Sequence, residues 1–295
     1  MRLKLTPAMW VMLGVCLSVI AQAAPIEVTD ARGKVIRLQQ PAERIVALAP
    51  HIVENVYSAG AGDTLVAAVS YSDYPPEAAQ LPQVGSYKLV NYEAILALKP
   101  DLVLGWASGN GEEAARQLER LGLTVYVDEL RSMEDIAGAI RTLGALAGTS
   151  ARANQRVDQW LDRLARLRAN YEQAPPVSVF YQVWNDPLQT LNGEHLVSDV
   201  IRLCGGRNIF ADAPALAPKI NIESVLARDP DAIVASGMGE ERPEWLDEWL
   251  AYPALQAVSE QNLFFVPPDI IQRHTLRILD GAQLLCQHLE KSRNP

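Results

Sequence analysis

Cysteine, histidine and basic side chains are all scarce in this sequence of 295 residues. Three cysteines, with no Cys-x-x-Cys pair among them, exclude a disulfide-dense scaffold and a cysteine-based zinc cluster. Lysine and arginine number 26 against 35 aspartates and glutamates, and the resulting formal charge of −9 argues against a nucleic-acid partner. With 49% hydrophobic and 21% charged residues, the composition is that of a globular chain and excludes a disordered or polytopic membrane protein.

Sequence motifs of common catalytic sites are also missing. The chain contains no Gly-x-Ser-x-Gly, His-Glu-x-x-His, phosphate-binding loop or calcium-loop pattern, and Gly60-Ala61-Gly62 lacks the third glycine of a dinucleotide fingerprint. The histidines are spread along the chain, which favours surface or helix-face positions over a metal site; they are His51, His195, His274 and His288. We therefore expect no enzymatic activity, no catalytic cofactor and no protein-bound metal.

The start of the chain carries its one long apolar stretch. Two basic residues precede an apolar run from about Ala8 to Ile20, and the small-residue sequence Ala21-Gln22-Ala23 follows. This order predicts a cleaved secretory signal peptide over residues 1–23, because about 13 apolar residues fall short of the roughly 20 that a spanning helix needs. The alternatives are a membrane anchor and a lipid-attached Cys16. Such a signal peptide would direct export of the chain to the periplasm. Its removal would leave 24 basic against 35 acidic side chains.

Export changes the interpretation of the two cysteines that remain after cleavage, Cys204 and Cys286. An oxidising compartment allows such a pair to form a disulfide, which we predict here. The loop would contain 83 residues counted inclusively. A loop of that size corresponds to roughly 4.5 kcal/mol of chain entropy in the unfolded state. The alternative is two buried thiols.

Short β-branched runs alternate with helical patterns along the rest of the chain, which predicts an α/β protein with mostly parallel sheets. The runs cover residues 45–49, 65–69, 102–105, 124–127, 177–183, 232–235 and 263–266. Between the fourth and fifth runs, residues 149–174 show apolar residues at helical spacing, and a helix from 149 to 172 would be about 36 Å long. We expect this helix to bridge two Rossmann-like lobes, residues 24–148 and 175–295. The alternative is an amphipathic core helix within a single domain.

An internal repeat supports the division into two lobes. Residues 91–101 and 221–231, which are 130 positions apart, share six identities in eleven. In each copy an asparagine is a favourable N-cap, a glutamate lies in the first turn, and Pro-Asp ends the helix before a strand. Glu93 and Glu223 could serve only their helices, at about 0.3–1 kcal/mol each. If a pseudo-twofold axis relates the lobes, the two carboxylates could also dock onto basic residues of a twofold-symmetric partner.

Aromatic and ionic side chains follow the ends of several predicted strands, where open α/β sheets bind ligands. They are Tyr71, Tyr74, Trp106, Trp184, Asp269 and Arg273, with Tyr87 in the loop before the repeat. Large flat rings suit a bulky, planar and mostly neutral ligand. For each single aromatic residue, ordinary core packing is the alternative.

Several segments of the sequence resemble the periplasmic vitamin B12-binding proteins that supply ABC importers. The resemblance extends from about residue 26 to 290 and is carried by residues 43–50, 71–76, 97–103 and 203–210. The Pro-Asp-Leu-Val element in the third segment is shared with siderophore and haem binders. The Ser-Asp-Tyr-Pro-Pro and Cys-Gly-Gly-x-Asn-Ile-Phe runs in the second and fourth segments point more narrowly to vitamin B12.

The resemblance implies two lobes bridged by a rigid helix, with modest closure around the ligand. Residues that match corrinoid contacts of the family are Tyr71, Tyr87, Trp106, Asp269 and Arg273. Glu93 and Glu223 match carboxylates that dock onto arginines of the membrane permease, and Cys204 and Cys286 match a bridged pair. Tyr87 and Ala217 stand where the family has tryptophan, and Trp184 is a candidate to compensate.

These observations together predict a monomeric periplasmic solute-binding protein. It would capture cobalamin or a related corrinoid and deliver it to an ABC transporter permease dimer in the inner membrane. The cobalt would stay in the corrin ring without a protein ligand. One alternative is a haem or ferric-siderophore binder of the same superfamily, in which Tyr71 or His51 would coordinate haem iron. A further alternative is a chelatase-like enzyme.

Overall fold

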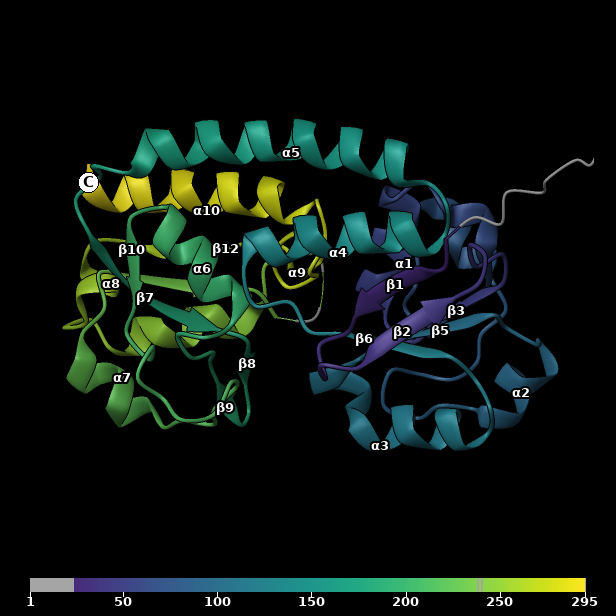
Figure 1. Ribbon diagram of the computed structural model, residues 1–295. Helices are drawn as coiled ribbons and strands as arrows, with labels where there is room; N and C mark the ends of the chain where they lie inside the picture. Colours follow the sequence, from purple (N-terminus) through teal and green to yellow (C-terminus); the bar gives the residue numbers. More distant parts are fainter. Residues whose placement is uncertain (1–23, 238, 240, 295) are drawn as a thin grey trace, which may run out of the picture.

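The computed structural model describes residues 24–237, 239 and 241–294, which form two α/β lobes joined by one long helix (Figure 1). The predicted signal peptide, residues 1–23, lies outside the described residues. Among the helices that are described, none is long and apolar enough to cross a membrane.

The N-terminal lobe contains a four-stranded parallel sheet in the order β4-β3-β5-β6. An antiparallel hairpin, β1-β2, which the sequence patterns did not predict, contacts α4 beside this sheet. The strands are β1 (Ile26–Thr29), β2 (Val35–Leu38), β3 (Ile45–Ala47), β4 (Leu65–Ala67), β5 (Leu102–Trp106) and β6 (Val125–Asp128). The helices are α1 (Pro50–Ser58), α2 (Tyr92–Ala97), α3 (Ala107–Arg120) and α4 (Met133–Leu146), with 3-10 turns η1 (Gly62–Thr64) and η2 (Pro76–Gln80).

The C-terminal lobe repeats this plan with a parallel sheet in the order β10-β7-β11-β12. Its strands are β7 (Val177–Gln182), β8 (Trp184–Asn185), β9 (Leu188–Gln189), β10 (Gly206–Asn208), β11 (Ala232–Ala235) and β12 (Leu263–Phe265). Its helices are α6 (Leu196–Leu203), α7 (Ile222–Arg228), α8 (Gln256–Ser259), α9 (Pro268–Ile271) and α10 (Ile278–Arg293), with the 3-10 helix η3 (Glu244–Ala251). The seven predicted strands are all present, whereas β10 and the β8-β9 hairpin were not predicted.

The sequence repeat corresponds to a structural repeat. The side chains of Asn91 and Asn221 cap α2 and α7 by accepting hydrogen bonds from the third residue beyond each, at 3.1 and 2.9 Å. Lys99 and Asp229, which are equivalent in the repeat, both adopt left-handed backbone conformations, with φ of 49° and 37°. Both helices end as predicted, before a Pro-Asp sequence that leads into β5 and β11.

The aspartate of each Pro-Asp sequence anchors the neighbouring central strand. Asp101 accepts a 2.9 Å hydrogen bond from the backbone of Arg44, just before β3. Asp231 accepts hydrogen bonds from the backbone and hydroxyl of Ser178 in β7, at 2.6 and 2.7 Å. Each aspartate therefore fixes its helix-to-strand unit against the sheet of its own lobe.

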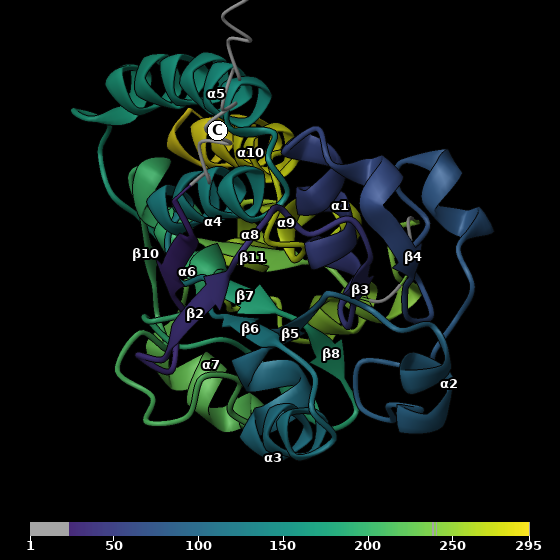
Figure 2. The same ribbon diagram turned by 45° about the vertical axis from the view of Figure 1, so that its right-hand side comes forward.

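The bridging helix is α5 (Ser150–Tyr171), which lies within the predicted 149–174 segment and is about 33 Å long at 1.5 Å per residue. Figures 1 and 2 show it along α4 of the first lobe and α10 of the second. Its buried residues include Val157 and Trp160, and the Trp160 indole donates a 2.8 Å hydrogen bond to Leu276 O in the second lobe. A continuous apolar cluster that includes Ile140, Val157 and Leu285 connects both lobes through this helix. Such a close-packed connection resists wide separation of the lobes.

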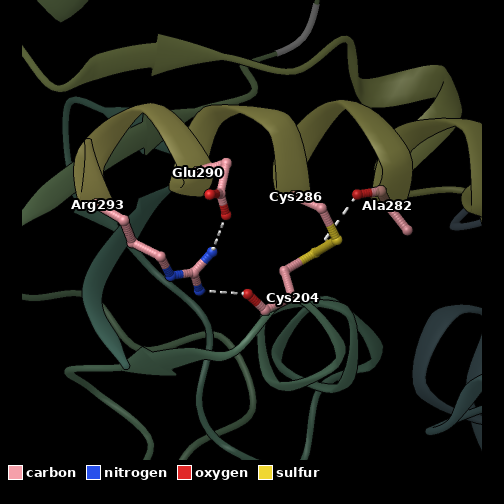
Figure 3. Close-up of a disulfide and its surroundings, with 5 residues drawn as sticks. All are labelled: Cys204, Ala282, Cys286, Glu290 and Arg293. Atoms are coloured by element: carbon pink, nitrogen blue, oxygen red, sulfur yellow. Dashed lines mark hydrogen bonds and ion pairs between the residues drawn. A yellow bond between two sulfur atoms is a disulfide. The ribbon is translucent and has the colours of Figure 1, made fainter. Parts of the chain in front are cut away.

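The predicted disulfide between Cys204 and Cys286 is present and links the end of α6 to α10 (Figure 3). Both residues are fully buried, and their Cα atoms are 4.7 Å apart. Arg293 donates a 2.6 Å hydrogen bond to Cys204 O and forms a 3.1 Å ion pair with Glu290. The disulfide and the hydrogen bond to Cys204 O hold α10 against the end of α6.

Candidate functional site

Two of the predicted ligand-binding aromatics, Tyr87 and Trp106, lie together in the N-terminal lobe. Their ring centroids are 6.0 Å apart, although all of α2 and most of β5 lie between them in the chain. Asn110 connects them: its side-chain oxygen accepts from Trp106 N at 2.8 Å, and its nitrogen donates to Tyr87 O at 2.6 Å. The same nitrogen donates to Leu48 O, just beyond β3, at 2.9 Å. Asn110 therefore fixes both aromatic residues relative to the sheet.

The indole of Trp106 lies against the backbone at Gly109. A Cβ atom at position 109 would be only 1.9 Å from Cε3 of Trp106, far inside van der Waals contact. Glycine is therefore required here for the observed ring position. The indole nitrogen of Trp106 is buried and has no hydrogen-bond partner among the described residues.

Where the two lobes touch, Trp106 contacts two histidines, and a third histidine contacts one of these two. His51 is the second residue of α1 in the first lobe, whereas His195 and His274 belong to the second lobe. The ring centroids of His51 and His274 lie 5.1 and 6.0 Å from that of Trp106. His274 is also 5.4 Å from His51 and 5.7 Å from His195. The prediction of surface positions was wrong for His51 and His274, which are 5% and 6% exposed, because the chain topology brings them together from distant segments; His195 is half-buried. The prediction of helix-associated positions holds for His51 and for His195, which caps α6 through a 3.1 Å hydrogen bond.

Two members of this cluster, His195 and His274, are electrically neutral around neutral pH. Burial, with a contribution from Arg131, lowers the pKa of His195 to about 4. Burial, followed by the charges of His51, His195 and Arg131, lowers the pKa of His274 well below its ordinary value. Within the part of the chain that the structure describes, no group of three histidine, cysteine or acidic side chains is arranged to hold a metal ion.

Arg273 and Asp269 form an ion pair at the same junction, and Asp73 of the other lobe joins them. The guanidinium of Arg273 is 3.1 Å from Asp269 and 2.7 Å from Asp73. Arg273 is only 15% exposed, whereas Asp269 and Asp73 are 31% and 55% exposed. The predicted pair thus becomes a group of three that spans the two lobes.

Further contacts seat the segment 272–277 of the second lobe against α1 of the first. Arg277 forms a two-pronged ion pair with Glu54 at 2.7 and 2.8 Å and lies 3.8 Å from the ring centroid of Tyr74. Asn55 donates a 2.9 Å hydrogen bond to His274 O. On the side of this junction that faces α5, a pocket of about 340 Å³ is lined mainly by charged and amide side chains. The side that contains Tyr87 and Trp106 is aromatic instead.

Within the described part of the chain, neither Tyr71 nor Trp184 makes a ring contact with this aromatic and histidine cluster. Tyr71 follows β4, is 77% exposed and has a φ of 67°. Trp184 is 37% exposed, and its indole donates to Asp186 O at 2.9 Å. In the β8-β9 hairpin Trp184 pairs with Gln189, whose side chain donates to Ala217 O at 3.2 Å. Trp184 therefore lies one strand away from the position where the resembled family has tryptophan.

Glu93 and Glu223 occupy equivalent exposed positions in the first turns of α2 and α7. Within the described residues, no ion pair involves either carboxylate. Figures 1 and 2 show α2 and α7 in separate lobes, both on the side of the molecule away from α5. Both carboxylates are thus available to a partner that approaches this side.

Comparison with known proteins identifies the family. The family described as "Periplasmic binding protein" matches residues 45–270. The chain belongs to this family. Periplasmic binding proteins are a family of binding proteins and not of enzymes.

Two curated relatives of this periplasmic binding protein are named vitamin B12-binding protein. One, from Vibrio cholerae serotype O1, is 37% identical over 250 residues, covering 85% of this chain and 90% of the relative. The other, from Yersinia pestis, is 36% identical over 256 residues, covering 87% and 89%. The crystal structure of the periplasmic vitamin B12 binding protein BtuF of Vibrio cholerae matches with a TM-score of 0.80 and 36% identity, over 86% of this chain and 99% of that one. The periplasmic heme-binding protein RhuT from Roseiflexus shares the fold, with a TM-score of 0.75 at 23% identity over 85% and 99%.

Sequence reasoning missed several residues that the structure places beside the candidate site residues. Gly109 and Asn110 lie three and four residues after Trp106, and a polar residue between glycines shortly after a strand was an available signal for a positioning role. Asp73 and the histidine cluster gave no local signal, because their partners lie in the other lobe.

Proposed function

We propose that this periplasmic binding protein captures cobalamin or a related corrinoid between its lobes and delivers it to an ABC transporter permease. The main support is that aromatic and ionic side chains from both lobes meet at one junction. The chain is also 37% identical to a vitamin B12-binding protein. Flat aromatic faces beside a few polar groups are suited to a wide, largely neutral ring system.

In this proposal Tyr87 and Trp106 supply apolar ring faces, and Asp269 and Arg273 bind polar groups on the corrinoid rim. Tyr71 and Trp184, both partly exposed, supply further ring contacts, with Trp184 replacing the tryptophan absent at Ala217. The cobalt remains in the corrin, and the protein contributes stacking and hydrogen bonds without ligating the metal. The ligand leaves chemically unchanged.

The lobes, which we assign to residues 24–148 and 175–295, close only modestly on the ligand. The apolar cluster shared through α5 supports this, because a wide hinge motion would break it. The chain acts as a monomer in the periplasm after removal of residues 1–23.

Delivery depends on Glu93 and Glu223 docking onto basic residues of a permease dimer. Two equivalent, exposed and unpaired carboxylates in structurally repeated helices match a twofold-symmetric basic surface. The orientation of α2 and α7 away from α5 leaves both carboxylates accessible together.

The ligand is tested by calorimetric titration of the mature chain with cyanocobalamin, cobinamide, haem and a ferric siderophore. We expect one-to-one binding of a corrinoid in preference to the other compounds, and no chemical change in the ligand. Tight haem binding with shifted absorption bands and no corrinoid binding would support the haem alternative. Insertion of free metal into a tetrapyrrole would support the chelatase-like enzyme.

Docking is tested by reversing both charges, Glu93→Arg and Glu223→Arg, and measuring ATP hydrolysis by the reconstituted transporter. We expect the stimulation of hydrolysis to be lost while corrinoid affinity stays unchanged. Glu77→Arg with Glu244→Arg is a matched control, because these glutamates are also exposed in first turns, one in each lobe. Unchanged stimulation by the first pair would reject the docking assignment.

A further inference from the structure

One cation at the lobe junction is shared by two carboxylates. Asp269 lies one helical turn from Arg273 in the same lobe, and Asp73 reaches the same guanidinium from the other lobe at 2.7 Å. Two carboxylates and one guanidinium leave this group with an excess negative charge.

The neighbouring arginines do not offset this excess. Arg277 is engaged by both oxygens of Glu54 at 2.7 and 2.8 Å, and Arg131 is paired with Glu129 at 2.8 Å. Asp269 alone balances the positive charge of Arg273, so the carboxylate of Asp73 is the excess negative charge. It is also 55% exposed and two residues from Tyr71, a proposed ligand contact.

The hydrogen-bonding capacity of the group distinguishes amides from carboxylates. A primary amide on a ligand has an oxygen that can accept from Arg273 and a nitrogen that can donate to an aspartate. An ionised carboxylate can only accept, so it offers the aspartates no donor beyond the one that Arg273 already provides, and it adds a like charge. Corrinoids such as cobalamin carry amide side chains around the ring, whereas haem carries two propionates.

We propose that Asp73 is a specificity-determining residue that favours tetrapyrroles with amide side chains over those with carboxylate side chains. It acts together with Asp269, which binds the same guanidinium of Arg273. This inference rests on the proposed function, because it concerns selection among ring ligands at the same site. Asp73 selects by its charge and by its capacity to accept a further hydrogen bond, while Arg273 contributes a donor that both classes of ligand can use.

The test compares cyanocobalamin with its monocarboxylic acids, in which one peripheral propionamide is hydrolysed. Calorimetry on the mature chain gives the ratio of Kd for each acid to Kd for the amide. In Asp73→Asn, which keeps the side-chain shape but removes the charge, we expect this ratio to fall by about fivefold for at least one acid, the size expected for a partly exposed charge. The effect should shrink in 0.5 M salt, because exposed charges are screened.

Asp158→Asn is the matched control, since Asp158 is an exposed aspartate, paired with Arg141 at 2.6 Å, on the bridging helix away from the junction. Its Kd ratios should equal those of the unmodified chain. Asp73→Ser provides a second variant should the asparagine variant fail to fold. If cyanocobalamin binds but the ratio is unchanged for every acid in the Asp73 variants, the inference is wrong. If the unmodified chain does not bind cyanocobalamin at all, the proposed function itself is overturned.

Discussion

Replacing Gly109 with alanine should weaken corrinoid binding by displacing Trp106. The added Cβ would lie 1.9, 2.5 and 2.5 Å from Cε3, Cδ2 and Cζ3 of the indole, so the ring cannot keep its position. Position 109 belongs to α3, whose backbone is anchored through Asn110 to two other segments, and this favours movement of the ring over movement of the backbone.

The expected effect on affinity follows from the loss of one aligned aromatic contact. Such contacts contribute about 0.5–1.5 kcal/mol beyond the apolar area they bury. With part of that area also lost, we expect a reduction of about 1–2 kcal/mol, or a Kd roughly 5 to 30 times higher. Overpacking should also lower the free energy of unfolding by about 1–3 kcal/mol. Titration calorimetry with cyanocobalamin and thermal unfolding measure the two effects.

Gly138→Ala is the matched control, because Gly138 lies inside α4 and a Cβ there would meet no atom within 4 Å. This variant should bind cyanocobalamin normally and gain up to about 1 kcal/mol in stability from the higher helix propensity of alanine. Normal affinity in Gly109→Ala, with the variant folded, would refute the assignment of Trp106 to the ligand site.

Two further predictions concern stability. Replacing both cysteines, Cys204→Ala with Cys286→Ala, should lower the free energy of unfolding by about 2–4 kcal/mol, because the unfolded chain is no longer constrained by the disulfide. Urea titrations measure this change, and an unchanged unfolding midpoint would contradict the prediction. The pKa of His195 is lowered to about 4 in the folded chain, against about 6.5 in the unfolded chain. As the pH falls from about 6.5 to 4, only the unfolded chain therefore binds a proton at His195. This difference should lower the free energy of unfolding by about 3 kcal/mol. His195→Asn, which retains an N-cap, should flatten the pH dependence of urea unfolding, and an unaltered slope would argue against the assignment.

Local sequence signals were sufficient for most of the architecture. The repeated Asn-x-Glu and Pro-Asp sequences predicted two equivalent helices and their ends, because N-caps and helix breakers act within a few residues. The apolar spacing around Val157 and Trp160 predicted the bridging helix for the same reason. The hairpin β1-β2 was missed, since its four-residue strands are too short for a reliable alternating pattern.

The candidate site was predictable only in part. Trp106 and Arg273 became candidates because they follow predicted strands, which is a local property, and their role in binding stays a prediction. The contact between Asp73 and Arg273 joins residues 200 positions apart, and the meeting of His51 with His274 also depends on how the lobes dock. Such pairings are set by tertiary packing, for which a single sequence contains no periodic signal.

The central claim is that a corrinoid is held between the lobes by aromatic side chains and Arg273. A crystal structure of the mature chain with bound cyanocobalamin tests it most directly. The account predicts the corrin ring against Tyr87 and Trp106, with Arg273 hydrogen-bonded to a side chain on the ring edge and no protein atom on the cobalt. A corrinoid bound elsewhere, or one whose cobalt is coordinated by a protein side chain, would contradict it.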